Sequence, residues 1–450
     1  MVSTSGTTST AKVVAYPRGR TAVVRWVFVD SFMRAFRAFG IRRTSMYVFG
    51  PVRGDDSLTS LLLDESGRPP YLATLQAPYR IHAWNRLRHL HDSYGTNAVR
   101  LWVLALSNPG VLYSTNPSTM STFFDELEAH WLQSSALVRD IIRGNGQVDP
   151  SLAAFTRRLA SRGFVDRFRA IAGSSTYLSI DRWAPAVTAY SCWTGGYVSP
   201  FLDRLEQYLP KTRFLRIPMY SMSTETLETI PDFRLGEVAF LPMAPGVCCE
   251  FLDYSAPRES RSLLAPRQLS VGGVYELVVS HSHGLRRYCT GDLFRVRGFV
   301  ANLPDIQFLR RRGLTYSFTG EKLTGTQAML AYDLLRSEFP DKVGDLPLTC
   351  FPSRRPAMRL PHYRIVAVYS GRDDPGQIPG LAERFDGLLC ESNSEYRAKR
   401  ASGRLGPVRQ ESASLRAMPT HLSDRLTPGV DSQFKLLPLY PRLWEERSRP

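Results

Sequence analysis

Residues 274–296 read VYELVVSHSHGLRRYCTGDLFRV, and this stretch does most to decide the fold. Two runs rich in β-branched and aromatic residues, Val274–Ser280 and Leu293–Val296, predict strands. The polar segment between them ends in Gly291-Asp292. An ionised aspartate at this place can accept hydrogen bonds from both hydroxyls of a ribose. The structural alternative is a hairpin in which the Gly-Asp pair forms the turn.

Strands and helices are mixed on both sides of this stretch. Further strands are expected at Ser45–Gly50, Ala98–Leu106, Phe214–Ile217, Glu237–Leu241, Val247–Leu252 and Tyr363–Ser370. Helices are expected at residues 23–39, from Asn116-Pro117-Ser118 onward, at Gln327–Phe339 and around Leu381–Arg400. Residues 401–432 are polar and rich in Gly, Ser and Pro, which is typical of a loop or mobile stretch. This mixture predicts α/β layers, and a chain of 450 residues predicts two or three domains.

The N-terminal stretch from Ser3 to Lys12 combines hydroxyl groups with a glycine, in the order STSGTTSTAK. Glycine allows close approach of the backbone, and hydroxyls with free N–H groups can hold phosphate oxygens. Lys12 could add a cation. A Ser/Thr-rich start is, however, more often a frayed terminus, and this stretch alone does not decide between the two.

Three further places could carry chemistry. Ser223-Thr224-Glu225 follows the strand expected at Phe214–Ile217, and its hydroxyls and carboxylate could orient a phosphate and a Mg²⁺ ion. The alternative is a capped turn. Arg311 could contact phosphate or ribose, and a mobile Lys322 ammonium could neutralise charge on the α-phosphate. For these two residues the alternative is a surface loop with ordinary charges.

Composition narrows the classes of function. The formal net charge is +16, but the positive charge is almost all arginine and is spread along the chain, and no nucleic-acid recognition motif accompanies it. We therefore expect no specific nucleic-acid partner. None of the six cysteines forms a CxxC pair, so a zinc site is not expected. There is no run of eighteen apolar residues and no secretory signal, so we expect no membrane span and a cytoplasmic location with reduced thiols.

The order and spacing of these pieces resemble the Gretchen Hagen family of acyl acid amido synthetases, the auxin-conjugating enzymes of plants and their bacterial members. The resemblance covers nearly the whole chain. The motifs that carry it are Thr4-Ser5-Gly6-Thr7-Thr8 with Lys12, Asn116-Pro117-Ser118-Thr119, Cys192-Trp193-Thr194-Gly195-Gly196, Ser223-Thr224-Glu225, Glu250-Phe251, Arg287-Tyr288 with Gly291-Asp292, Phe308, Arg311, Lys322, Glu395-Tyr396 and Gln433-Phe434-Lys435.

The resemblance implies the acyl-adenylate-forming fold of the luciferase superfamily, with a large mixed-sheet domain and a small mobile α+β domain. The expected domains are residues 1–321 and 322–450, the first starting without the segment that opens the family's large domain. The implied activity is ATP- and Mg²⁺-dependent conversion of a carboxylic acid to an acyl-adenylate, followed by conjugation to an amine such as an amino acid. Transfer to a thiol such as coenzyme A, and a nucleotide-binding protein without catalysis, remain the alternatives.

The resemblance also implies roles for individual residues. Thr4, Ser5, Gly6, Thr7 and Thr8 would hold the triphosphate together with Ser223 and Thr224. Glu225 would bind Mg²⁺, Asp292 the ribose, and Arg311 would support the nucleotide. Lys322 and Lys435 would act at the adenylate, the latter from the small domain. The chain departs from the family pattern at Cys248 and Cys249, which stand where an aromatic residue stacks on adenine, and at Ser221 and Arg286, which replace usual aromatic residues.

Overall fold

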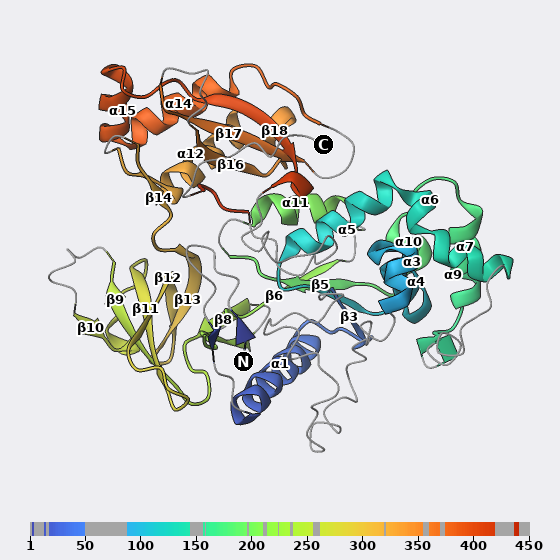
Figure 1. Ribbon diagram of the computed structural model, residues 1–450. Coiled ribbons are helices and arrows are strands. Elements are labelled where there is room, and N and C mark those ends of the chain that lie inside the picture. The colour runs from blue at the N-terminus through green and yellow to red at the C-terminus, as the bar shows by residue number, and fades with distance from the viewer. Residues whose placement is uncertain are drawn as a thin grey trace.

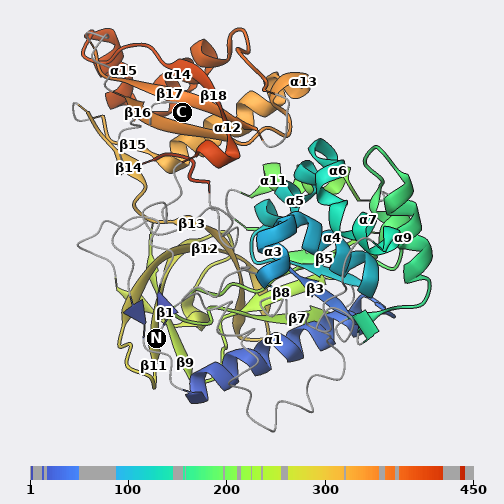
Figure 2. The same cartoon turned by 45° about the vertical axis from the view of Figure 1, so that its right-hand side comes forward.

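The computed structural model describes residues 2–3, 13–14, 18–49, 88–144, 156–157, 159–195, 198–209, 214–223, 225–234, 237–254, 262–318, 321–353, 360–369, 374–418 and 436–440. Within these ranges the elements gather around three larger sheets, and three further sheets have two strands each (Figure 1). A parallel sheet and an antiparallel sheet lie side by side, and a smaller C-terminal sheet with its helices lies above them in the views of Figures 1 and 2. The predicted α/β class is confirmed.

Four parallel strands form the first sheet. In spatial order they are β3 (Met46–Val48), β4 (Val111–Tyr113), β5 (Ala189–Cys192) and β6 (Leu215–Pro218). The helices of this part are α1 (Arg18–Ala38), α3 (Arg88–Tyr94), α4 (Thr96–Ser107), α5 (Pro117–Ala129), α6 (Trp131–Ser134), α7 (Ala136–Arg143), α9 (Phe164–Gly173), α10 (Ile180–Trp183) and α11 (Ser199–Gln207). Figures 1 and 2 show α1 below the sheet and α5 and α11 above it. Because helices cover both faces, β3, β4 and β5 are completely buried.

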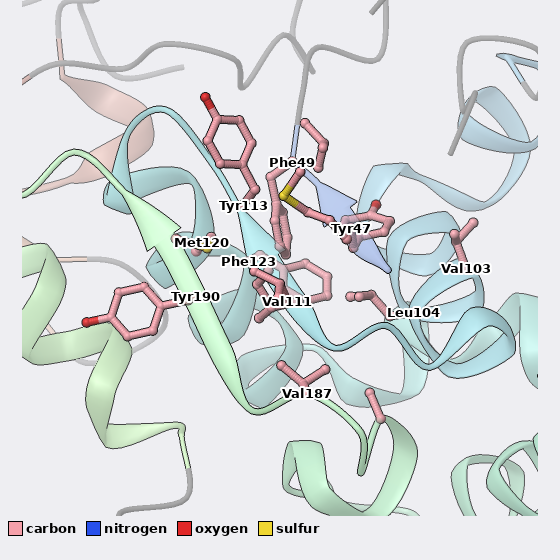
Figure 3. Close-up of a cluster of buried hydrophobic side chains, with 14 of the residues drawn as sticks. Tyr47, Phe49, Val103, Leu104, Val111, Tyr113, Met120, Phe123, Val187 and Tyr190 are labelled. Carbon is pink, nitrogen blue, oxygen red and sulfur yellow. The ribbon is translucent and has the colours of Figure 1, made fainter. Parts of the chain in front are cut away.

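Aromatic residues fasten the helices to this sheet. Phe28 and Phe32, one turn apart on α1, both meet the ring of Tyr113 edge-on, with centroids 5.3 and 5.5 Å away. Phe49 makes a similar contact with Phe123 of α5 at 5.2 Å. Figure 3 shows Val103 and Leu104 of α4 completing the same buried cluster. The helix predicted over residues 23–39 and the helix predicted from Asn116 onward are therefore confirmed as α1 and α5.

The strand predicted at Ala98–Leu106 is wrong, because these residues form helix α4. Every residue from Ala98 to Ser107 is buried. A helix that is buried on all sides has no polar face, so its sequence lacks the 3.6-residue period and looks like a buried strand. The helix ends where Asn108 adopts the left-handed conformation, with φ of 45°.

The antiparallel sheet contains the stretch that opened the sequence argument. Its spatial order is β10 (Leu263–Leu264), β9 (Val247–Asp253), β11 (Val274–His281), β12 (Tyr288–Val300) and β13 (Leu303–Arg311). The hairpin of β7 (Ile230–Arg234) and β8 (Glu237–Leu241) lies against β13. Strand β12 begins five residues earlier than predicted, at Tyr288. Gly291-Asp292 therefore lies inside a strand, and the turn alternative for this pair is wrong.

The C-terminal sheet has β17 (His362–Tyr369) between β16 (Leu348–Ser353) and β18 (Arg409–Ser414). Its helices are α12 (Gly325–Glu338), α13 (Pro340–Val343), α14 (Leu381–Ser392) and α15 (Ser394–Ala401). The expectation of a loop over residues 401–432 is wrong at β18, an edge strand held by parallel pairing with β17 although its sequence is polar. The predicted helix around Leu381–Arg400 is divided at Asn393, whose side chain accepts from the Tyr396 N–H and caps α15.

Helix α11 connects the parallel sheet to the C-terminal elements, as both views show (Figures 1 and 2). Phe201 of α11 is buried in a cluster with Phe351, Val366 and other apolar residues of the C-terminal part. One turn further along, Arg204 bonds to Asp125 of α5 at 2.8 Å and reaches Asp345 of the C-terminal part at 3.3 Å. This face of α11 therefore holds the C-terminal elements in the observed orientation.

Candidate nucleotide and acyl-transfer site

A tight hairpin between β6 and β7 presents the predicted Ser-Thr-Glu motif. Its two arms pair through the N–H of Glu228, which donates to the Ser221 carbonyl at 3.1 Å. At the tip, the N–H of Ser223 donates to the carbonyl of Thr226 at 2.9 Å. Across the base, the N–H of Ser221 donates to Oγ1 of Thr229 at 2.8 Å. Ser223 and Glu225 are thus held by short backbone contacts, while Thr224 lies outside the described residues.

Glu225 is buried at the tip of this hairpin, and residues from distant elements meet there. The hydroxyl of Tyr288, the first residue of β12, donates to Oε1 of the Glu225 carboxylate at 3.4 Å. The guanidinium of Arg20 on α1 donates to the Glu225 backbone carbonyl. His281 at the end of β11 faces the same group, and burial together with the Arg20 charge lowers its pKa. A carboxylate with one donor keeps acceptor capacity for a cation or a polar ligand.

Asp292 lies on β12, four residues after Tyr288, and is also buried. Its backbone pairs with Arg311 of β13, and its N–H donates to Oγ1 of Thr290 at 3.1 Å. The Thr290 hydroxyl in turn donates to the carbonyl of Leu277 on β11 at 2.9 Å. The main chain on both sides of Asp292 is therefore fixed within the sheet. The structure describes only the backbone of Arg311, which lies opposite Asp292 on β13.

The ion pair between Arg312 and Glu276 lies next to strand β12. Arg312 donates from its backbone N–H to the Gly291 carbonyl at 2.6 Å, and its Nη1 lies 2.6 Å from Oε2 of Glu276. Glu276 on β11 is fully buried, whereas the side chain of Arg312 is 45% exposed. The pair therefore anchors the residue that precedes Asp292.

Glu228 is a site residue that sequence reasoning missed. It is 1% exposed, and the hydroxyl of Ser221 donates to its Oε2. Burial, followed by the negative charge of Asp292, raises the pKa of the Glu228 carboxyl, and a hydrogen bond to Asp292 raises it further. The structure thus brings Glu228 and Asp292 together. No local motif in the sequence marks Glu228, because Asp292 lies 64 residues further along the chain.

The predicted phosphate-binding residues Thr4, Ser5, Gly6, Thr7 and Thr8 lie outside the described residues, as does Lys12. The strands on either side of them are described. Strand β1 (Val2–Ser3) pairs antiparallel with β2 (Val13–Val14), with Val2 opposite Val14. This pairing brings the two ends of the intervening stretch together. The frayed-terminus alternative does not hold for these two short strands.

Lys322 lies where the two large groups of elements meet, and its backbone has φ of 47°. It comes directly before β15 (Leu323–Thr324), which pairs with β14 (Thr315–Tyr316). Its neighbour Glu321 is buried and accepts bonds from the Phe318 N–H and the Tyr363 hydroxyl, each at 2.7 Å. The Lys322 side chain itself is exposed, and no described residue forms an ion pair with it. Its segment is therefore anchored while its ammonium group stays in solvent.

Lys435 lies outside the described residues, but the chain that follows it is firmly held. Pro438 accepts a bond from the Tyr332 hydroxyl at 2.8 Å, and Tyr440 donates from its N–H to the Cys350 carbonyl at 2.9 Å. Leu436 and Leu437 are buried in the same cluster as Phe201. The stretch next to Lys435 is thus fastened at the contact between the C-terminal elements and α11.

Two features describe the surroundings of the carboxyl groups. Cys248 is exposed and Cys249 is buried on β9. Trp193, after β5, stacks on Phe308 of β13 with centroids 5.1 Å apart, and this contact joins the two sheets. Within the part of the chain that is described, no group of three or more His, Cys, Asp or Glu side chains could hold a metal ion.

The GH3 family central domain matches residues 240–311, the range of the antiparallel sheet that carries Asp292. A probable indole-3-acetic acid-amido synthetase, GH3.4 of Oryza sativa subsp. japonica, is 29% identical over 63% of this chain and 47% of that protein. The indole-3-acetic acid-amido synthetase GH3.2 of Arabidopsis thaliana is 27% identical over 47% of this chain and 41% of that protein. The matched part is thus less than half the length of these relatives.

The fold agrees with solved structures of one kind of enzyme. The acyl acid amido synthetase AtGH3.15, in complex with 2,4-DB, superposes with a TM-score of 0.71 at 18% identity, covering 99% of this chain and 79% of that chain. A second structure of the GH3.15 acyl acid amido synthetase gives a TM-score of 0.66 over 98% of this chain and 80% of that chain. The expected amido synthetase fold is therefore confirmed. Among the described helices, none has the length and apolar character that crossing a bilayer requires.

Proposed function

Because the chain carries a GH3 family central domain on the fold of an acyl acid amido synthetase, we propose that it activates a carboxylic acid with ATP and transfers the acyl group to an amine. The observation that carries the proposal is that the matched domain meets the hairpin between β6 and β7, where Tyr288 bonds to Glu225 and Asp292 lies beside Glu228. Buried polar groups from separate elements that converge in this way are typical of a binding site.

The first step is adenylation. An oxygen of the substrate carboxylate attacks the α-phosphorus of ATP, a new P–O bond forms, and pyrophosphate leaves. Asp292 accepts hydrogen bonds from the ribose hydroxyls, and Arg311 supports the nucleotide. The hydroxyls of Ser223 and Thr224 and the stretch from Thr4 to Thr8 hold phosphate oxygens. Lys322 offsets negative charge at the α-phosphate.

The Glu225 carboxylate fits a magnesium site, because it is a buried oxygen ligand with one described donor, the Tyr288 hydroxyl. Bound Mg²⁺ would neutralise charge on the triphosphate. Since the described residues contain no larger metal-binding group, Glu225 would be joined by phosphate oxygens and water as further ligands. Tyr288 and Arg20 then hold Glu225 in position.

The second step is acyl transfer. A neutral amine, which we propose to be the amino group of an amino acid, attacks the acyl carbon, loses a proton and releases AMP. We propose that residues 322–450 act as a small domain that rotates about Lys322 between the two steps and brings Lys435 to the adenylate. The partners are thus small molecules, with no specific nucleic acid. All six cysteines are free, which supports a cytoplasmic location.

The decisive experiment is ATP–pyrophosphate exchange with a panel of aryl, indolyl and aliphatic acids. We expect exchange that depends on one class of acid, and an amide product when amino acids are added. A thioester formed only with coenzyme A would replace the amide proposal with a thiol ligase. Lack of exchange with every acid, together with ATP binding in calorimetry, would favour the second candidate, a nucleotide-binding protein without catalysis. The absence of an aromatic residue at Cys248 and Cys249 favours that candidate.

Asp345→Ala is expected to change the balance of the two half-reactions. The substitution removes the contact from the C-terminal part to Arg204 but leaves the Arg204–Asp125 pair intact. A partly exposed ion pair contributes at most about 1 kcal/mol, which corresponds to about fivefold in the population of the docked orientation. Exchange and amide formation should therefore change in opposite directions by up to that factor.

Asp341→Ala is the matched control for this prediction, since Asp341 is an exposed residue of α13, the short helix that precedes Asp345. It should leave both rates unchanged. Equal effects of Asp345→Ala on the two half-reactions would contradict a role of the α11 contact in domain orientation.

A further inference from the structure

Glu228 has a carboxyl group for which the proposed reaction has no direct use, and its surroundings are unusual. The side chain is 1% exposed, and its Oε2 accepts the Ser221 hydroxyl. Its Oε1 is fully buried and accepts no bond from any described donor. The group that it faces is the carboxyl of Asp292, which belongs to a different element, strand β12.

Two carboxyl oxygens can share a hydrogen bond only when one of the two groups carries a proton. Two adjacent buried carboxylates would instead repel each other in a medium where charges are weakly screened. Proton sharing therefore removes both the repulsion and the unsatisfied buried oxygen. Glu228 is the better place for the proton, because it is the more deeply buried of the two, with 1% exposed against 7% for Asp292, and burial disfavours the charged form.

We propose that Glu228 is a positioning residue that, in its protonated form, donates a hydrogen bond to Asp292 and fixes the orientation in which that carboxylate accepts the ribose hydroxyls. The proposal rests on the proposed function, since it assigns Asp292 to the ribose. Glu228 itself does not touch the nucleotide. It acts through Asp292, whose backbone is already fixed by Thr290 and by pairing with Arg311.

The proposal has a pH dependence whose sign follows from the arrangement. The titratable groups that interact with Glu228 are Asp292 from β12 and Cys249 from β9. Burial raises the pKa of both Glu228 and the Cys249 thiol, so neither group is readily ionised. As the pH rises through the raised pKa of Glu228, the carboxyl must ionise beside Asp292. The hydrogen bond is then lost, and nucleotide affinity falls above this pKa. The free energy of unfolding declines over a lower window, as the pH rises from the ordinary carboxyl pKa of the unfolded chain, about 4.3, to the raised pKa of the folded chain, and then levels off.

The test compares the whole chain with Glu228→Gln, Glu228→Ala and the matched control Glu237→Gln between pH 6 and 9. Glu237 is an exposed residue of β8, so Glu237→Gln makes the same chemical change at a carboxyl group that is open to solvent. Two quantities are measured, the dissociation constant for Mg·ATP and the midpoint of thermal unfolding. Glutamine keeps a hydrogen-bond donor at every pH, whereas alanine removes it.

The wild-type chain and Glu237→Gln should lose Mg·ATP affinity by up to about tenfold per pH unit above the Glu228 pKa. Glu228→Gln should bind within about threefold of the wild-type value at pH 6 and lose the alkaline decline, and Glu228→Ala should bind more weakly at all pH values. A decline in Glu228→Gln identical to that of wild type would overturn the proposal.

The unfolding profiles separate this inference from the proposed function. If the wild-type chain binds no nucleotide at any pH, the proposed function fails, and the Glu228 assignment is decided by unfolding alone. A fall in the wild-type midpoint from pH 6 up to the Glu228 pKa that is absent from Glu228→Gln would support the shared proton. Identical profiles for the two chains would reject it.

Discussion

Asp292→Ala is expected to lower ATP–pyrophosphate exchange by about 10²-fold or more. A carboxylate that accepts both ribose hydroxyls contributes two charge-assisted hydrogen bonds, each worth about 1.5–3 kcal/mol. Every 1.4 kcal/mol corresponds to about tenfold. The loss should fall mainly on kcat/KM for ATP, because the ribose does not react. Exchange measured over a range of ATP concentrations, with the acid held at saturation, resolves the effect.

The same substitution should leave the fold intact. Removing the Asp292 carboxyl leaves the protonated Glu228 without its hydrogen-bond partner but creates no buried charge, so the midpoint of thermal unfolding should fall only modestly. Asp166→Ala is a suitable control, since Asp166 is a highly exposed residue of α9. Unchanged exchange in Asp292→Ala would remove the ribose assignment, and a collapse of stability would show that Asp292 has a structural role instead.

The sequence predicted the strands around Asp292 because they contain short runs rich in β-branched and aromatic residues. Strand β11 is buried at every residue from Tyr275 to Val279, and on β12 buried and exposed residues alternate only from Phe294 to Arg297. Helix α4 and strand β18 depart from this pattern in opposite ways. Every side of α4 is buried, whereas β18 is a polar edge strand that depends on backbone pairing with β17. No local pattern marks either element.

The candidate site, like the fold, could be predicted only in part from the sequence. Motif spacing identified Ser223, Glu225 and Asp292 as members of one site, and the structure places Glu225 and Asp292 on neighbouring buried elements. Glu228 could not be found in this way, because its importance comes from facing Asp292, about 64 residues away in sequence, and not from any local motif. Contacts that depend on long-range register are fixed only by the assembled sheet and hairpin.

Arg312→Met is expected to cost about 3 kcal/mol of unfolding free energy. The partner of Arg312, Glu276, is fully buried on β11 and would keep its charge without a cation. Breaking one side of a buried ion pair typically costs about 3–5 kcal/mol, and the lower end applies because the side chain of Arg312 is 45% exposed. Urea unfolding at pH 7 measures the loss directly.

Two further variants separate charge from packing. Arg312→Lys keeps a cation near Glu276 and should recover much of the loss, although it cannot reproduce the guanidinium geometry. The double variant Glu276→Gln, Arg312→Met removes both charges and should be more stable than Arg312→Met alone. A double variant that is as unstable as the single one would show that the aliphatic stem of Arg312, and not its charge, supports the sheet.

Nucleotide recognition gives the last check on Arg312→Met. Arg312 donates to the Gly291 carbonyl through its backbone N–H, which the substitution retains. The KM for ATP should therefore stay within about threefold of the wild-type value under folded conditions, which makes the loss one of stability and not of nucleotide recognition.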